Sequence, residues 1–241
     1  MGAHVESVGS TNLELAKLFH ESGRRLDRYW LTSDEQVMGR GRRERNWVSP
    51  PGNLYASLCL DVSAVPDRSM AVLPLAIGVA IQKCVASLVA NPVLLKWPND
   101  VLIDGAKCCG LLLERHIHPQ SGDVGLIVGI GLNVASHPPD TPYPATHLSA
   151  HGFAGDLSTV FNHLTMCVAE ALANWRSPDF VADVTGQWTE HAKGIGEPVV
   201  VRLANETLSG IFDELDAQGR LMLRMANGDK RSITAGDVFF S

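Results

Sequence analysis

The turns between successive apolar segments constrain the fold of this chain most strongly. Residues 93–98 and 101–103 are sheet-forming segments separated by Asn99-Asp100, and the next turn, Asp104-Gly105, leads into residues 107–114. Asp-Gly is typical of hairpins because both residues tolerate the positive φ that a two-residue turn needs. Strands joined in this way run antiparallel, so the pattern predicts an α+β fold rather than a doubly wound parallel sheet. Further strands are expected at residues 29–32, 53–62 and 124–134.

Apolar segments with helical character predict helices that pack on this sheet. The longest, residues 70–90, contains Pro74, Gln82 and Lys83, which favours a buried helix over a membrane span. Residues 157–175 repeat apolar side chains along one helical face, and a further helix is expected at about 179–191.

The character of the chain changes near its C-terminus. Residues 199–203, 208–213, 220–225 and 231–234 read as short strands separated by turns such as Asn227-Gly228. The pattern predicts a small antiparallel barrel, which is too short to hold much of a core alone. We therefore expect a first domain at residues 1–193 and a second at residues 194–241.

Composition excludes some classes of function. The 241 residues carry a net charge of −6, so a general affinity for nucleic acid is not expected. The N-terminus has no apolar core typical of a signal peptide. The five cysteines show no Cys-x-x-Cys spacing, which favours reduced, buried thiols in a cytoplasmic protein. They are Cys59, Cys84, Cys108, Cys109 and Cys167.

The segment Gly39 to Trp47 cannot be an ordinary core element. It reads Gly-Arg-Gly-Arg-Arg-Glu-Arg-Asn-Trp, with no apolar periodicity and with glycines that weaken helices and strands. One interpretation is a solvated, mobile basic loop. The other is a loop that closes over a small anionic ligand with its guanidinium groups. The segment alone favours neither.

Several polar or glycine positions also have two interpretations. Ser10 or Thr11 can cap a helix at residues 13–19, with Glu14 completing a capping box. Lys96 ends an apolar strand, where it either extends to water or fixes a cation on a rigid element. The glycines of Gly129-Ile130-Gly131-Leu132-Asn133 allow either a helix or a ligand to lie against the strand.

No metal site is expected. Asp100, Asp104 and Glu114 form no evident cluster, and the two aspartates are better explained as turn residues. His116 and His118 have strand spacing, but Pro119 follows them and favours a loop.

Taken together and in this order, the motifs closely resemble those of the biotin protein ligases. The resemblance covers nearly the whole chain, and Gly-Arg-Gly-Arg-Arg and Lys-Trp-Pro-Asn-Asp are specific as a pair. The motifs are Ser10-Thr11-Asn12, Asp34-Glu35-Gln36, Gly39 to Arg43, Lys96 to Asp100, Lys107 with Gly110, and Gly129 to Asn133.

The resemblance implies a catalytic fold similar to class II aminoacyl-tRNA synthetases, with a mixed sheet flanked by helices and an SH3-like barrel after it. It implies an ATP-dependent ligase that activates biotin to biotinyl-5′-AMP and transfers it to a lysine of a biotin carboxyl carrier domain. ATP and Mg²⁺ are the implied co-substrate and ion, with no tightly bound prosthetic group. A monomer or weak homodimer is expected, with no DNA or membrane partner.

The resemblance also implies roles for individual residues. Lys96, Arg40 and Arg42 are the expected catalytic cations. Biotin contacts are expected from Ser10, Thr11, Asn12, Gln36, Gly39, Arg40, Lys96 and Gly110. ATP contacts are expected from Arg42, Arg43, Arg45, Trp47, Lys96 and Asn133. Gly110, Gly129 and Gly131 would line the slot for the ring of biotin, with Lys107 at its edge and Trp47 against the adenine.

Three departures from the family pattern stand out. Glu44 replaces a usual glycine of the loop, and Cys108-Cys109 replaces aliphatic or small residues. The chain also begins close to Ser10, so the DNA-binding domain and repressor role of bifunctional members are not expected. A lipoate or octanoate ligase or transferase on the same fold is the alternative function. A non-catalytic module that binds nucleic acid is disfavoured by the negative net charge.

Overall fold

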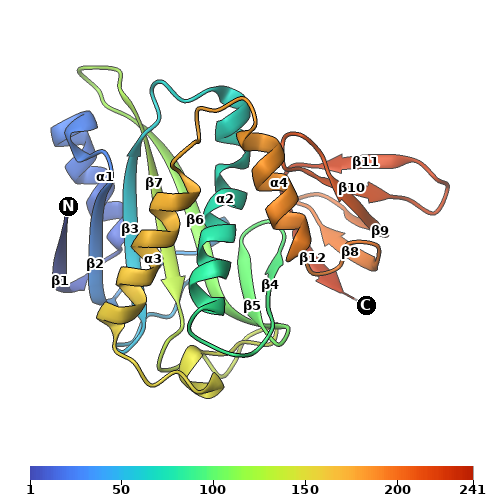
Figure 1. The fold of residues 1–241 in the computed structure, drawn as a ribbon, viewed down its shortest axis with the longest axis horizontal. Helices are drawn as coiled ribbons and strands as arrows, with labels where there is room; N and C mark the ends of the chain where they lie inside the picture. The colour runs from blue at the N-terminus through green and yellow to red at the C-terminus, as the bar shows by residue number, and fades with distance from the viewer. Residues whose placement is uncertain (241) are drawn as a thin grey trace.

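A seven-stranded mixed sheet forms the centre of the larger part of the molecule (Figure 1). The computed structural model describes residues 1–240, apart from the side chain of Glu44. The departure from the family pattern at Glu44 therefore lies outside the described part. The strands lie in the order β1 (Gly2–Val8), β2 (Tyr29–Gln36), β3 (Leu54–Asp61), β7 (Val124–Leu132), β6 (Ala106–Ile117), β5 (Asp100–Ile103) and β4 (Val93–Lys96).

The predicted hairpins are confirmed. β4, β5, β6 and β7 pair antiparallel in chain order, whereas β1 and β2 pair parallel. Asp104 and Gly105 have φ values of 49° and 80°, as a tight hairpin turn requires. Asp100 is the first residue of β5 and stands opposite Lys96 in the register, so it lies on the sheet rather than only in a turn.

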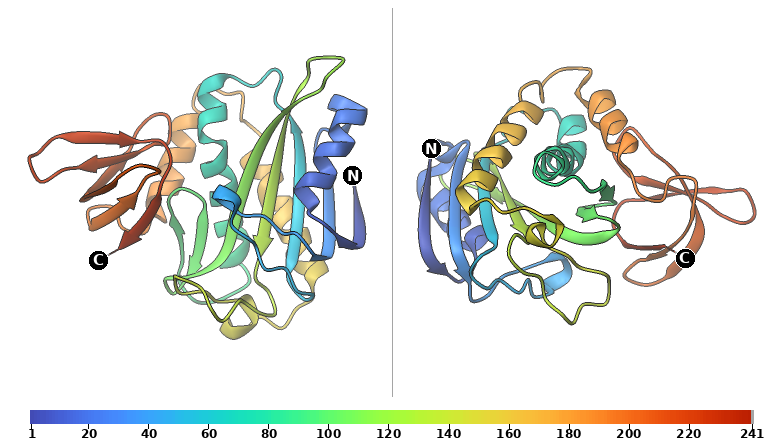
Figure 2. Two further views of the ribbon diagram at one scale, coloured as in Figure 1. Left: turned by 180° about the vertical axis from the view of Figure 1, so that it is seen from behind. Right: turned by 60° about the horizontal axis from the view of Figure 1, so that its bottom comes forward.

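Helices cover both faces of this sheet (Figure 2). α1 (Thr11–Ser22) packs on β2, β3 and β7, while α2 (Asp67–Ala86), α3 (Leu157–Ala171) and α4 (Phe180–Glu190) form a layer on the other face. Successive strand residues point to opposite faces, so Leu58 and Leu60 join the α2–α4 core while Cys59 packs in the α1 cluster. Short 3₁₀ turns lie at Gly23–Leu26 (η1), Arg42–Glu44 (η2) and Leu148–His151 (η3).

Helix α2 is the central core element. By length and composition it could cross a membrane, but 72% of its most apolar stretch is buried inside the protein. The prediction of a buried core helix is therefore confirmed.

A second, five-stranded antiparallel sheet follows α4. Its order is β11 (Lys230–Ile233), β10 (Leu221–Arg224), β9 (Thr207–Leu215), β8 (Pro198–Arg202) and β12 (Asp237–Phe240). Trp188 of α4 packs against Phe212, with ring centroids 6.4 Å apart. The Trp97 indole N–H donates a 3.0 Å hydrogen bond to the Gly219 carbonyl. The tryptophan of the Lys-Trp-Pro-Asn-Asp motif therefore anchors the second sheet on the first.

Two strands were not anticipated from the sequence. β1 is an edge strand with mostly exposed residues, so it lacks the apolar alternation that identifies a strand. β12 is only four residues long and forms by pairing with β8, whose residues lie 35 to 41 positions earlier. Both strands depend on partners that are distant in sequence.

The thiols provide a first prediction. Burial raises the pKa of Cys59 and Cys84 to about 12, and it raises the pKa values of Cys108 and Cys109 as well. Since the thiolate is the nucleophile, these four should resist iodoacetamide at pH 8, while the less buried Cys167 reacts first. Mass spectrometry should find one rapid modification in the native protein and five in urea. Rapid native labelling at Cys108 or Cys109 would contradict this packing.

Candidate functional site

A cavity lies on the sheet face that α1 covers only in part. Its floor comes from β6 and β7, where Gly110, Gly129 and Gly131 line it, and the Gly/Arg loop, residues 39–47, closes over it. Along β7 these glycines share a face with Ile127, which packs under α1. Because the glycines have no side chains, this face of the sheet is hollowed into a recess beside α1. The sequence interpretation of a strand against which a ligand lies is consistent with this recess.

The polar residues before and within α1 form one end of the cavity. Ser10, Thr11 and Asn12 are all buried. Ser10 occupies the N-cap position without a side-chain cap bond, and Glu14 bonds Lys17 instead. The predicted cap and capping box are therefore wrong, because these polar groups serve the cavity wall.

A hydrogen-bond network joins this end of the cavity to β2. The Thr11 backbone N–H and Oγ1 donate to Gln36 Oε1 at 2.9 and 3.0 Å. Gln36 Nε2 donates to Ser49 Oγ at 3.1 Å. Ser57 Oγ lies 2.8 Å from Thr11 Oγ1 and 2.6 Å from Asn12 Oδ1. The network fixes the orientation of several donors and acceptors that a polar ligand could use.

The Gly/Arg loop is folded rather than extended. The Gly41 N–H donates to the Arg45 carbonyl at 2.7 Å, and the Trp47 N–H donates to the Gly39 carbonyl at 2.9 Å. A Cβ on Gly39 would lie 2.3 Å from the Trp47 carbonyl oxygen, so only glycine permits this turn. Gly39 thus shapes the loop and does not itself line the cavity.

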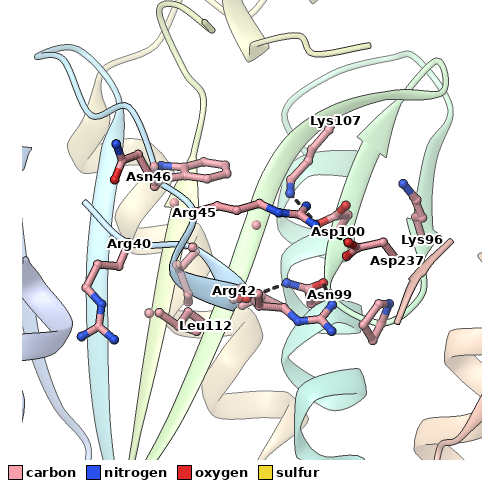
Figure 3. Close-up of a pocket in the computed structure, with 18 of the residues that line it drawn as sticks. Arg40, Arg42, Arg45, Asn46, Lys96, Asn99, Asp100, Lys107, Leu112 and Asp237 are labelled. Carbon is pink, nitrogen blue, oxygen red and sulfur yellow. Dashed lines mark hydrogen bonds and ion pairs between the residues drawn. The ribbon is translucent and has the colours of Figure 1, made fainter. Parts of the chain in front are cut away.

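The four loop arginines point to different partners. Arg40 lies apart from the others and pairs with Glu114 at 3.2 Å (Figure 3). Arg42 donates to Asn99 Oδ1 at 2.8 Å, and burial lowers its pKa. Arg43 and Arg45 both pair with Asp237 of the second sheet. Arg40, Arg42 and Arg45 line the cavity, whereas Arg43 lines an adjoining hollow.

Two lysines and an aspartate form the cationic end of the cavity (Figure 3). Lys107 Nζ lies 2.6 Å from Asp100 Oδ1. Burial opposes the charge of Lys107, but the attraction of Asp100 outweighs it and the pKa of Lys107 is raised. Burial lowers the pKa of Lys96, whose ammonium faces the rings of Phe239 and Phe240 at 5.7 and 6.0 Å. Sequence reasoning missed Asp100 as a site residue, since it was assigned to a turn.

Trp47 occupies part of the glycine recess. A Cβ on Gly131 would lie 2.4 Å from the Trp47 indole nitrogen, and a Cβ on Gly110 would lie 3.0 Å from the same side chain. Lys107 Nζ lies 5.3 Å from the ring centroid. The remaining cavity is about 110 Å³, below the range of about 300–1,000 Å³ of most small-molecule sites. The loop therefore lies closed on the recess and must move to admit a large ligand.

The Trp47 indole N–H is buried and has no hydrogen-bond partner within the described residues. A buried donor without a partner loses the free energy of its bond to water. Movement of Trp47 out of the recess would return this donor to a hydrogen-bond partner.

Asn133 lies outside the main cavity. Its side-chain amide donates to the Thr146 carbonyl at 3.0 Å and lies along the adjoining hollow. Its expected contact with ATP remains a prediction. Asp237 was not anticipated, because nothing local in the sequence brings the C-terminal strand to the loop.

The geometry suits a reaction between anions. One end of the cavity presents fixed hydrogen-bonding groups, and the other presents Lys96, Lys107 and loop arginines. Such pre-oriented cations stabilise negative charge that develops in a transition state. A loop that closes over them excludes water from a reactive product.

Comparison with known proteins gives independent findings. A model of the biotin/lipoate A/B protein ligase family matches residues 10–133. A model of the biotin protein ligase C-terminal domain matches residues 194–241.

Similar proteins match over nearly their full length. A biotin–[acetyl-CoA-carboxylase] ligase of Paracoccus denitrificans is 34% identical, with 100% of this chain and 99% of that protein covered. One of Mycobacterium tuberculosis is 33% identical, with 97% and 86% covered. The structure of a biotin protein ligase from Aquifex aeolicus with biotin and ATP is 26% identical, with 100% and 99% covered and a TM-score of 0.83.

Proposed function

The chain belongs to the biotin/lipoate A/B protein ligase family, and on that premise we propose how its cavity works as a biotin ligase. The enzyme activates biotin with ATP to biotinyl-5′-AMP and transfers the biotinyl group to a protein. One observation supports the assignment of roles within it: a single cavity joins a polar end, at Thr11 and Gln36, to a cationic end, at Lys96 and Lys107. Biotin has the same polarity, with a polar ureido ring at one end and a carboxylate at the other.

We assign the ureido ring to the polar end. Ser10, Thr11, Asn12 and Gln36 surround it, and buried ureido groups need such partners. The apolar ring and tail of biotin would lie on the glycines of β6 and β7, in the recess that Trp47 now occupies. Trp47 would then turn outward, toward the nucleotide.

The carboxylate would reach the cationic end, where it meets the α-phosphate of ATP. Two anions repel, and Lys96, Lys107 and Arg42 offset this repulsion. A carboxylate oxygen attacks the α-phosphorus, a new P–O bond forms, and pyrophosphate leaves with the electrons of the broken bond. Cations that hold the phosphate oxygens favour the attacking geometry. Arg40, Arg43, Arg45 and Asn133 are proposed contacts of the ligands around this centre.

Mg²⁺ enters this reaction as part of the ATP substrate. Among the residues that the structure describes, no three His, Cys, Asp or Glu side chains gather to hold a metal. Asp100 is engaged by Lys107, and Asp237 by two arginines. We therefore propose that the phosphate oxygens are the principal ligands of the ion.

The protein substrate is proposed to be the biotin carrier domain of a carboxylase, from the names of the full-length relatives. We further propose a catalytic domain at residues 1–193 and an SH3-like domain at 194–241, which the C-terminal family match supports. A cytoplasmic monomer or weak homodimer remains our expectation.

Replacing Thr11 with Val tests the polar end. The change keeps the shape but removes the hydroxyl, which donates to Gln36 in the free protein and which we assign to the ureido ring in the complex. Bound biotin therefore loses one buried hydrogen-bond partner. We expect biotin to bind about 10- to 100-fold more weakly, from the cost of an unmet buried hydrogen bond. Calorimetric titration measures this. Thr32→Val is the matched control, since Thr32 contacts the exposed His4 outside the cavity.

The same titration tests biotin against lipoate, the alternative ligand of the family. The wild-type protein should bind biotin and fail to exchange it for lipoate. Tighter binding of lipoate, with no effect of the Thr11 change, would assign the cavity to the other branch of the family.

A further inference from the structure

Strand β12 lies at the mouth of the cavity and meets the Gly/Arg loop directly. Asp237 Oδ2 accepts from Arg43 Nη1 at 3.1 Å and also from an Nη2 N–H of Arg45. One residue earlier, the Gly236 carbonyl accepts from Arg42 Nη2 at 3.4 Å. These three contacts tie the loop to Gly236 and to Asp237, the first residue of β12, which lie more than 190 residues later in the chain.

The loop is shaped to present both guanidinium groups to one carboxylate. Arg43 adopts φ 54°, in the left-handed region, and the hydrogen bond from Gly41 to Arg45 closes the turn around it. A left-handed conformation is unfavourable for a residue with a side chain, so contacts made by that residue must compensate. The ion pair of Arg43 is such a contact.

Burial distinguishes these pairs from ordinary surface ion pairs. The Asp237 side chain is 19% exposed, against 35% for Arg43 and 56% for Arg45. Exposed pairs contribute little to stability, but a mostly buried carboxylate shared by two cations is more costly to leave unpaired. Asp237 also lines the cavity itself (Figure 3). The next two residues of β12, Val238 and Phe239, line it as well.

We propose that Asp237 is a positioning residue that anchors the Gly/Arg loop over the cavity. The second sheet thereby holds the loop in its closed form when no ligand is bound. Arg43 and Arg45 are kept oriented and close to the cavity mouth. One consequence rests on the proposed function. The phosphates of ATP would replace Asp237 as the partner of the two arginines, which Asp237 holds in place before ATP arrives.

Hydrogen–deuterium exchange of the ligand-free full chain tests the anchor without any assumption about activity. Asp237→Asn keeps the side-chain shape and removes its charge. We expect amides 39–47 to exchange about tenfold faster, as the loss of two partly buried ion pairs implies. Asp237→Glu keeps the charge and should restore most of the protection.

Asp213→Asn is the matched control. Asp213 also pairs with two cations of the second sheet, Arg224 at 3.1 Å and Lys230 at 2.6 Å, but it does not contact the loop. Its replacement should leave amides 39–47 unchanged. The double variant Arg43→Gln, Arg45→Gln removes the same anchor from the loop side and should show the same faster exchange of amides 39–47. It serves as the test if Asp237→Asn folds poorly.

The outcomes separate cleanly. Exchange in Asp237→Asn within twofold of wild type would overturn the proposal. Faster exchange across all of β8 to β12 would overturn it too, because Asp237 would then stabilise the whole second sheet rather than the loop. Since no ligand is present, a failure of biotin binding would contradict the proposed function while leaving this test intact.

Discussion

Lys96→Met should lower the rate of biotinyl-AMP formation by about 10²- to 10³-fold, the usual effect of removing one pre-oriented charge-stabilising group. Lys96 ends β4, stands opposite Asp100 in the register and lines the cavity. Its ammonium is largely withdrawn from water, so burial lowers its pKa and strengthens its attraction for a phosphate. Methionine retains the length and apolar stem of lysine, which limits the change to the charge.

Single-turnover quench with labelled ATP measures this rate directly. Lys193→Met is the matched control, because Lys193 also lies over Phe240, at 4.8 Å, but does not line the cavity. The control should form adenylate at close to the wild-type rate. A Lys96 variant that formed adenylate within threefold of wild type would remove Lys96 from the catalytic assignment.

Gly131→Ala should weaken biotin binding about 10- to 100-fold, as overpacking of 1–3 kcal/mol implies. The added methyl group would lie 2.4 Å from the Trp47 indole nitrogen and 2.5 Å from Cε2. It would also fill the recess that we assign to the ring and tail of biotin. The clash with Trp47 would disturb the closed loop of the ligand-free protein, whereas the filled recess would remove the surface on which biotin lies, and this second effect weakens binding.

Titration with biotin, followed by tryptophan fluorescence, gives the affinity and reports the movement of the loop. Gly186→Ala serves as the control, because a methyl group there meets no atom within 4 Å. Its affinity for biotin should equal that of wild type. If Gly131→Ala also bound biotin normally, the ligand would have to lie elsewhere than on β7.

Local signals in the sequence predicted the framework well. The Asp104-Gly105 turn and the apolar run of α2 each report their structure through neighbouring residues. β1 and β12 carry little such signal, because each forms by pairing with a strand far away in the chain. The SH3-like description of the second sheet and the boundary at residue 194 remain predictions.

In the candidate site, too, contacts between residues distant in sequence could not be predicted. The composition of the Gly/Arg loop excluded a core element, but the roles of the loop and of Lys96 came from the resemblance to biotin protein ligases. The structure brings both to one cavity. Asp100 was missed because it follows an asparagine in a turn-like pair, and nothing in the sequence shows that the fold places it against Lys107. The helix cap at Ser10 was wrong because the local capping pattern competes with a tertiary network through Gln36 and Ser57.

The most direct test of the central claim uses the wild-type protein with biotin and α-labelled ATP, first without and then with a biotin carboxyl carrier domain. We predict that labelled biotinyl-AMP forms and stays bound under the loop until the carrier is added. One carrier lysine then gains biotin as AMP is released. If neither adenylate nor modified carrier appears at stoichiometric protein concentration, the cavity does not perform the reaction that we assign to it.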